Sequence, residues 1–282
     1  MFLSLGWSSE GNARRLPKSG TRDAGHGTGG TGCASLVPRP ASPYTSRVRF
    51  DEQTVVLTGV GRQGQVGEVV ARAFAERGAT VVVVDRDQQV EARAVALREA
   101  GFVARAKVCD LTNETQVANL AREVGAESDG QIGALINLAG GFALSGPVAE
   151  SKLEEWQRQI TINLTTAYLA TRAFLPALRK GRGSIVYFSS ASALPGSRIA
   201  KTAAYAAAKS GLVALMRAVA EEERDTGVRA NAVAPTSIRT ASNIDSMGQK
   251  VRYVEREQVA DVVLYLCSPQ ASAVTGQVME LK

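Results

Sequence analysis

Residues 54–85 read "TVVLTGVGRQGQVGEVVARAFAERGATVVVVD". Both ends of this stretch are short runs of β-branched residues, which favour β-strands. Between them, a glycine-rich turn is followed by apolar residues at helical spacing, namely Val66, Val69, Val70, Ala73 and Phe74. A strand, a helix and a second strand in this order form a βαβ unit, in which the two strands are parallel.

The same alternation continues along the chain. Further strand-like runs are "ALIN" at 134–137, "SIVYFSS" at 184–190 and "VRANAVAP" at 228–235, and longer segments with helical periodicity separate them. Near-continuous apolar runs are typical of parallel strands that are buried on both faces. The sequence therefore predicts an α/β protein with a doubly wound parallel sheet, the Rossmann fold, in one domain that spans residues 51–282.

Residues 1–50 form a separate segment rich in Gly, Ser, Pro and Arg, which we expect to be disordered because it has no apolar periodicity. It resembles a transit peptide in composition, although an over-long gene model or a plain flexible tail is the simpler interpretation. The segment contains "GTGGTG" at 27–32, which matches a dinucleotide-binding fingerprint but lacks a preceding strand and a following helix. We therefore reject it as a binding site.

The distribution of charge argues against a nucleic-acid partner. The net charge is +6, but residues 1–50 hold seven of the 33 basic residues and only two of the 27 acidic ones, so the rest of the chain is nearly neutral. The three cysteines are too widely spaced for a disulfide framework or a zinc site. No apolar run approaches the ~18 residues of a membrane span, and "MFLSLGW" is too short and lacks the basic start of a secretory signal. We expect a cytoplasmic protein without a membrane partner.

The glycine-rich turn after the first strand is the candidate site for a dinucleotide. Gly59, Gly61 and Gly64 form G-x-G-x-x-G directly before a helix, whose N-terminus can hold a pyrophosphate. Asp85 ends the second strand, where a carboxylate can accept hydrogen bonds from ribose hydroxyls and repel a 2′-phosphate. A nucleotide-free turn with Asp85 as a helix cap is the alternative. A P-loop is excluded, because Gln65 and Val66 follow Gly64 where Lys and Ser or Thr are needed.

A tyrosine and a lysine in "YAAAK" are candidates for proton transfer. Tyr205 and Lys209 are four residues apart, so on a helix they lie on one face. Hydride transfer to a carbonyl leaves an oxyanion that needs a proton, which tyrosine can supply if a nearby cation lowers its pKa from ~10. The only histidine, His26, lies in the tail, so the domain cannot contain a Ser-His-Asp triad or a histidine-based metal site. Taken alone, the pair could also be an ordinary exposed Tyr and Lys.

An ordered set of motifs resembles the short-chain dehydrogenases/reductases over nearly all of residues 53–280. The motifs are "TGVGRQGQVG", "VVVVDRD", "CDLT", "NLAG", "INLTTAYLATRAFLPAL", "GSIVYFSS", "YAAAK" and "VRANAVAPTSIRT". The resemblance implies that Tyr205 is the catalytic acid/base, that Lys209 lowers its pKa and binds the nicotinamide ribose, and that Asn163 supports a proton relay. The serine that holds the substrate oxygen is Ser190 by its place after the strand. Counting thirteen residues back from Tyr205 gives Ser192, but a longer loop between them favours Ser190.

The resemblance also implies which residues bind the cofactor. Asp110 should contact the adenine region, Asn137 and Gly140 should line the adenine-side ribose, and residues after Pro235 should meet the nicotinamide amide. The complete expected set is Gly59, Gly64, Val66, Gly67, Asp85, Arg86, Asp110, Leu111, Asn137, Gly140, Tyr205, Lys209, Pro235, Ile238 and Thr240. The segment "ASNIDSMGQKVRY", residues 241–253, should close over the nicotinamide.

Three positions depart from the family pattern. The glycine-rich turn is two residues longer than usual, which makes Gly67 the last motif glycine and leaves the middle one as Gly64 or Gln65. Leu138 stands where the family usually has a second Asn, and Thr236 where Gly is usual. These changes affect local turns and leave the Tyr-Lys pair in place.

We expect an oxidoreductase that transfers a hydride between a nicotinamide cofactor and a secondary alcohol or ketone. Asp85 favours NAD, whereas Arg62 or Arg86 could pair with the 2′-phosphate of NADP. The alternatives are a catalytically silent NAD-binding or regulatory protein and an NADPH-dependent 3-oxoacyl thioester reductase. The helices expected near 153–180 and 203–225 correspond to those that pair in the family, so the resemblance implies a homodimer or homotetramer.

Overall fold

The computed structural model describes residues 48–282. The predicted tail lies outside the described residues except for positions 48–50, and so do His26 and the rejected "GTGGTG" motif. Val48 and Phe50 are buried in the core, and the rings of Phe50 and Phe74 pack edge to face with centroids 4.8 Å apart. The folded domain therefore begins before residue 51, earlier than the sequence suggested.

Seven parallel strands form one sheet in the order β3-β2-β1-β4-β5-β6-β7. The strands are β1 Thr54–Thr58, β2 Thr80–Asp85, β3 Ala104–Val108, β4 Ala134–Asn137, β5 Ser184–Phe188, β6 Arg229–Pro235 and β7 Val278–Leu281. The order runs outward from β1 in one direction and from β4 in the other. This arrangement confirms the predicted doubly wound parallel sheet.

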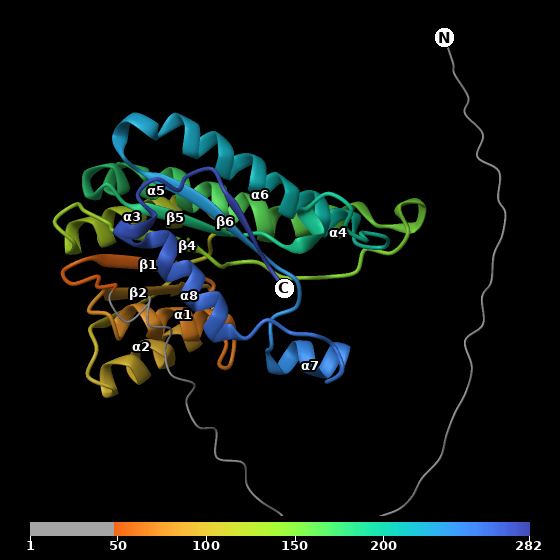
Figure 1. Cartoon of the computed structure of the whole chain (residues 1–282), viewed down its shortest axis with the longest axis horizontal. Helices are drawn as coiled ribbons and strands as arrows, with labels where there is room; N and C mark the ends of the chain where they lie inside the picture. Colours follow the sequence, from red (N-terminus) through yellow and green to blue (C-terminus); the bar gives the residue numbers. More distant parts are fainter. Residues whose placement is uncertain (1–47) are drawn as a thin grey trace, which may run out of the picture. The chain divides into compact units, whose positions relative to one another are not determined.

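Helices cover both faces of the sheet, with α1, α2 and α8 on one face and α3, α5 and α6 on the other (Figure 1). The helices are α1 Val66–Ala75, α2 Gln89–Glu99, α3 Glu114–Glu127, α4 Leu153–Ile160, α5 Thr166–Gly181, α6 Ala203–Glu222, α7 Ala241–Met247 and α8 Arg256–Cys267. A short π-helix, Thr161–Thr165, joins α4 to α5.

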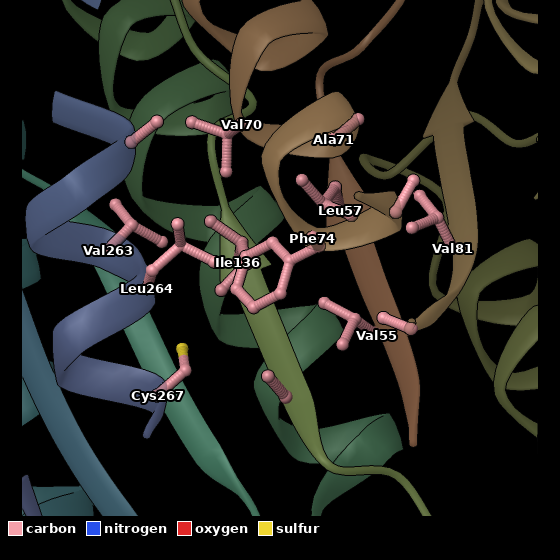
Figure 2. Packing of buried hydrophobic residues seen from close by; sticks show 14 of the residues in the cluster. Val55, Leu57, Val70, Ala71, Phe74, Val81, Ile136, Val263, Leu264 and Cys267 are labelled. Atoms are coloured by element: carbon pink, nitrogen blue, oxygen red, sulfur yellow. The ribbon is translucent and has the colours of Figure 1, made fainter. Parts of the chain in front are cut away.

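The core lies between the sheet and these two helical layers. On the first face, Val70 and Phe74 of α1 meet Val263 and Leu264 of α8 above Ile136 of β4 (Figure 2). All five side chains are inaccessible to solvent. The strands therefore need apolar residues at successive positions, which explains the continuous apolar runs in the sequence.

The loops after β1 and β4 touch where the strand order reverses. Gly59 has a φ of +77°, and a Cβ atom at this position would lie 2.7 Å from the Cα of Ala139. The hydroxyl of Thr58 accepts a hydrogen bond of 3.3 Å from the backbone N–H of Ala139. Only glycine permits this approach, which brings the glycine-rich turn beside the loop that carries Gly140.

Candidate active site

A cavity of about 180 Å³ lies at the carboxyl ends of β4, β5 and β6. In parallel α/β sheets this edge is where ligands bind. Seven of the predicted residues line the cavity: Gly140, Asn163, Ser190, Tyr205, Lys209, Pro235 and Ile238. The structure therefore brings the predicted proton-transfer groups together with residues expected at the nicotinamide.

Ser190 lies two residues after the end of β5 and directly before a short 3-10 turn that spans Ala191–Ala193. Its hydroxyl accepts hydrogen bonds from the backbone N–H and the hydroxyl of Ser192, at 3.2 and 3.0 Å. Ser190 lines the cavity and Ser192 does not. Of the two serines considered from the sequence, Ser190 is the one that faces the Tyr205 hydroxyl.

Tyr205 is in the first turn of α6. Burial raises the pKa of its phenol, and the hydrogen bond with Ser190 lowers this pKa by a smaller amount. The net direction is upward, whereas the sequence led us to expect a pKa lowered by Lys209. Burial disfavours the charged phenolate, and this desolvation outweighs the hydrogen bond.

Lys209 is fully buried one turn further along α6. Its ammonium Nζ donates a hydrogen bond of 2.7 Å to the backbone carbonyl of Phe188 and lies 5.7 Å from the centroid of the Tyr205 ring. Burial lowers the pKa of Lys209 to about 8. A lysine in this state carries charge at neutral pH but releases its proton far more easily than an exposed one.

Asn163 lies in the π-helix between α4 and α5, a distortion that is frequent at functional sites. Its Oδ1 accepts a hydrogen bond of 3.1 Å from the N–H of Gly141, and its Nδ2 donates one of 2.9 Å to the carbonyl of the same residue. A Cβ atom at Gly140 would lie 2.5 Å from Asn163 Oδ1. Asn163 thus clamps the loop after β4 against the helix, and glycine at 140 permits the contact.

Asp85 at the end of β2 contacts the glycine-rich turn. Its Oδ2 accepts a hydrogen bond of 2.9 Å from the N–H of Gly61, and its Oδ1 accepts one of 3.1 Å from the N–H of Asp87. A Cβ atom at Gly61 would lie 2.7 Å from Asp85 Cγ. Gly61 belongs to the sequence fingerprint but was missing from the expected cofactor-binding set, and its contact with Asp85 shows that it shapes the turn.

The lengthened turn is fixed at Gly64. This residue has a φ of +72°, its N–H donates a hydrogen bond of 2.6 Å to Glu68 Oε2, and its carbonyl accepts one of 2.8 Å from Arg256 Nη1. The next residue, Gln65, reaches the hydroxyl of Ser242 at 3.5 Å. The turn is therefore held by residues from α8 and from the segment expected to close over the nicotinamide.

The groups in this region fit a dinucleotide. Helix α1 begins at Val66, followed by Gly67, and the side chain of its N-cap residue Gln65 makes no capping hydrogen bond. The first N–H groups of the helix are donors for an anion, and the carboxylate of Asp85 is an acceptor suited to ribose hydroxyls.

Arg86, Asp110 and Leu111 lie at the carboxyl ends of β2 and β3, away from the cavity. Hydrogen bonds from the backbone and hydroxyl of Thr112 lower the pKa of Asp110, and the nearby charge of Arg86 lowers it further. Arg86 and Arg62 are exposed, and Leu111 is buried. These positions suit contacts with an adenine and its ribose rather than with the reacting group.

Asn137 and Thr240, both in the expected set, also lie outside the cavity lining. Asn137 donates a hydrogen bond of 3.3 Å to the hydroxyl of Thr171, which is bonded to the hydroxyl of Tyr187, while its buried Oδ1 has no partner among the described residues. Thr240 is the N-cap of α7 and accepts a hydrogen bond of 3.2 Å from the N–H of Asn243. Asn137 supports the sheet and Thr240 shapes the segment above the cavity.

Residues 241–253, here called the flap, are joined at their base. Ile238 and Val254 form a parallel β-bridge, and the N–H of Val254 donates a hydrogen bond of 2.8 Å to the carbonyl of Ser237. Arg239 and Glu255 form an ion pair of 2.7 Å. The two ends of the flap are therefore held together beside β6.

Sequence reasoning missed Phe142 and Gln159. Phe142 is 63% exposed, lines the cavity, and packs edge to face on Tyr205 with ring centroids 5.1 Å apart. Gln159 is completely buried and contacts Asn163. The available signals were an aromatic residue directly after "NLAGG" and a glutamine one helical turn before Asn163.

Two absences within residues 48–282 bear on other functions. No helix in this part of the chain is both long and apolar enough to cross a bilayer. Nor do three or more His, Cys, Asp or Glu side chains gather there as ligands for a metal ion.

Comparison with known proteins gives consistent matches. The family model described as enoyl-(acyl carrier protein) reductase matches residues 59–281. A meso-2,3-butanediol dehydrogenase of Serratia marcescens is 34% identical over 81% of this chain and 92% of its own length. A short-chain type dehydrogenase/reductase from Mycobacterium ulcerans has a similar structure, with a TM-score of 0.74 and 29% identity over 83% of this chain and 89% of the other.

A second solved structure contains a nucleotide. It is a protein from Beutenbergia cavernae described as an NAD(P)-dependent gluconate 5-dehydrogenase, with NADP bound at low occupancy. Its TM-score is 0.75 and its identity 31%, over 82% of this chain and 96% of the other.

Proposed function

The chain belongs to the short-chain dehydrogenase/reductase family, and on this ground we propose that it is an oxidoreductase that interconverts a secondary alcohol and a ketone with a nicotinamide cofactor. The observation that carries this proposal is the meeting of Asn163, Ser190, Tyr205 and Lys209 around one cavity. A protein that only binds a nucleotide has no need of a phenol, a hydroxyl and a buried ammonium at the same place.

In the proposed mechanism, the bound nicotinamide ring supplies or accepts the hydride. A tyrosine with its ordinary pKa of ~10 is protonated at neutral pH, and burial raises the pKa of Tyr205 further, so its phenol can donate a proton to the oxygen of the reacting carbonyl. The Ser190 hydroxyl bonds to that phenol and can turn its single hydrogen to the same oxygen when substrate is present. Both hydroxyls then stabilise the developing oxyanion.

In the direction of alcohol oxidation, Tyr205 must accept a proton and therefore has to act as a phenolate. The ammonium of Lys209 lies 5.7 Å from the ring centroid in a buried environment, where charge interactions are stronger than in water. Its positive charge favours the phenolate. Asn163 holds Gly141, which lines the cavity.

We propose that NAD is the preferred cofactor. The carboxylate of Asp85 is held beside the glycine turn by the N–H of Gly61, where it would repel a 2′-phosphate. Arg86, which follows Asp85 in the chain and is a candidate partner for such a phosphate, already interacts with Asp110. NADP use remains the alternative, and Arg62 is the free cation of the turn that would support it.

The substrate side of the cavity favours a neutral molecule. Among the lining residues only Lys209 is charged, and its ammonium is bonded to the carbonyl of Phe188. Phe142 provides an aromatic wall beside Tyr205. We propose an uncharged secondary alcohol with an apolar group next to the carbinol carbon.

We also propose a cytoplasmic homodimer or homotetramer. Leu153, Trp156 and Tyr168, on α4 and α5, are 64%, 42% and 44% exposed, and a second copy of the chain would cover them. Sedimentation of the purified protein would test the oligomeric state, and a monomer at micromolar concentration would contradict it.

The first experiment is to measure binding of NADH and NADPH by calorimetry, followed by turnover on a panel of secondary alcohols and ketones. Selective NADH binding with turnover of neutral alcohols supports the proposal. NADH binding without turnover of any panel member supports the catalytically silent alternative. Selective NADPH binding with reduction of a 3-oxoacyl thioester supports the other alternative.

A further inference from the structure

Three side chains, those of Glu155, Gln159 and Asn163, form a hydrogen-bonded line that begins near the surface at Glu155 and ends at Asn163. Gln159 lies one turn before Asn163 and is completely buried. Its Nε2 donates a hydrogen bond of 3.0 Å to Glu155 Oε1, and its Oε1 accepts one of 3.0 Å from Asn163 Nδ2. Glu155 has a side chain that is 26% exposed and also contacts Arg158 at 3.3 Å.

The two amides in this line can each point in either direction, because the amide oxygen and nitrogen have nearly the same size. A carboxylate only accepts hydrogen bonds, so Glu155 requires the NH₂ group of Gln159 on its side. The oxygen of Gln159 then faces Asn163 and requires the NH₂ group of that residue. This leaves Asn163 Oδ1 as the acceptor for the N–H of Gly141, which is the contact observed. Asn163 Nδ2 also donates to the backbone carbonyls of Gly141 and Gln159, and these contacts favour the same orientation.

We propose that Glu155 and Gln159 are positioning residues that reinforce the amide orientation of Asn163, which the backbone of Gly141 also favours, and thereby help to hold Gly140 and Gly141 in the cavity wall. A reversed Asn163 amide would place its NH₂ group against the N–H of Gly141, two donors without an acceptor between them. The catalytic consequence rests on the proposed function, while the orientation of Asn163 does not depend on it.

Four variants test this proposal, assayed on the alcohol that the panel ranks highest. Gln159→Leu removes both polar groups, and Glu155→Gln replaces the carboxylate by an amide that can also donate. Gln159→Glu places two carboxylates side by side. The double variant Glu155→Gln with Gln159→Glu restores a donor facing an acceptor and an acceptor facing Asn163.

We expect kcat to fall about ten- to a hundredfold in Gln159→Leu and Gln159→Glu, because small displacements of positioned groups cost this much. The KM for the cofactor should change less than kcat, because Gly140 adjoins Asn163 but Asp85 and the glycine turn are held by hydrogen bonds of their own. Glu155→Gln should show a smaller loss. The double variant should recover at least part of the activity lost in Gln159→Glu, whereas the exposed neighbour variant Glu154→Gln should match the wild type.

A measurement that needs no substrate separates this proposal from the proposed function. Hydrogen exchange of the Asn163 side-chain amide, followed by NMR on ¹⁵N-asparagine-labelled protein, should be slow in the wild type and in Glu154→Gln. It should become at least tenfold faster in Gln159→Leu. Unchanged exchange in Gln159→Leu, or a double variant no more active than Gln159→Glu, would overturn the positioning role. Absence of turnover in the wild type would count against the proposed function alone.

Discussion

The backbone N–H of Gly61 donates a hydrogen bond of 2.9 Å to the carboxylate of Asp85, 24 residues later in the chain. This contact joins the glycine-rich turn to the end of β2. The shape of the turn and the charge beside the expected ribose therefore depend on each other, which makes both residues informative to change.

Gly61→Ala should weaken NADH binding. The added Cβ atom would lie 2.7 Å from Asp85 Cγ, so the carboxylate or the turn has to move. We expect the Kd measured by calorimetry to rise about tenfold or more, in line with the loss of one well-placed charged hydrogen bond. Gly125→Ala in α3 is the matched control, because a Cβ there meets no atom within 4 Å, and it should bind NADH as the wild type does.

Asp85→Asn should shift cofactor preference toward NADPH. The amide keeps an oxygen that can accept from Gly61 but no longer repels a 2′-phosphate. Removing one such repulsion near the surface is worth roughly 1 kcal/mol, or about fivefold in the ratio of NADPH to NADH affinity. Asp85→Ala should also raise this ratio, but with weaker binding of both cofactors because the anchor of the turn is lost. An unchanged ratio in both variants would show that Asp85 does not discriminate the ribose.

Tyr205→Phe should abolish turnover and retain cofactor binding. Removing the phenolic hydroxyl eliminates the proton donor, which is worth about 10²–10⁴ in kcat. Tyr265→Phe, at a partly exposed tyrosine on α8, is the control and should keep its activity. Wild-type-like rates in Tyr205→Phe would refute the proposed mechanism.

Lys209→Met should change how stability depends on pH. The folded-state pKa of about 8 is below the ordinary value of 10.5, so between these values the unfolded chain holds the proton more tightly than the folded one. Protonated Lys209 therefore opposes folding below pH 8, and this cost disappears as the pH rises toward 10.5. Lys209→Met has no ammonium to bury, so its stability carries no such cost at any pH.

Denaturant unfolding of both proteins between pH 7 and pH 11 measures this effect. The stability of Lys209→Met relative to the wild type should decrease over this range, by on the order of 3 kcal/mol. The lost hydrogen bond to the Phe188 carbonyl shifts the difference equally at each pH. A difference that is independent of pH would mean that the folded-state pKa of Lys209 is not lowered.

Phe142→Ala should reduce selectivity for apolar substrates. Two ketones of nearly the same shape, cyclohexanone and tetrahydropyran-4-one, differ in the polarity of the ring atom opposite the carbonyl. The wild type should prefer cyclohexanone, and loss of the aromatic wall should lower this preference about tenfold, as for other apolar contacts. Val103→Ala, at an exposed residue before β3, is the control. Equal preference in Phe142→Ala and the wild type would contradict the assignment.

The sequence predicted the strands at the centre of the sheet and missed β3 and β7 at its edges. An edge strand pairs on one side only and need not be continuously apolar. In β3, Arg105 and Lys107 alternate with alanines and form ion pairs with Glu127, and Lys107 also pairs with Glu123. Strand β7 has only four residues, none of them fully buried. Neither pattern stands out from a loop in a single sequence.

The proton-transfer residues were accessible from the sequence because each lies in a motif at a fixed place along a strand or helix. Phe142 and Gln159 were not, for different reasons. Phe142 reaches Tyr205 through the path of the loop after β4, which has no periodicity. Gln159 contacts Asn163 on a helix that changes to π geometry at Thr161, and the side chains that share a face there depend on this change.

The paired base of the flap makes the stability of the domain largely independent of the length of the flap. Because Ile238 and Val254 already hold its two ends together, added residues enlarge a loop that is closed in any case. Each doubling of such a loop costs only about 0.6 kcal/mol of closure entropy. Insertions between these two residues can therefore accumulate while β6 and α8 keep their packing, and this is where descendants of the protein can acquire new substrates at little cost to folding.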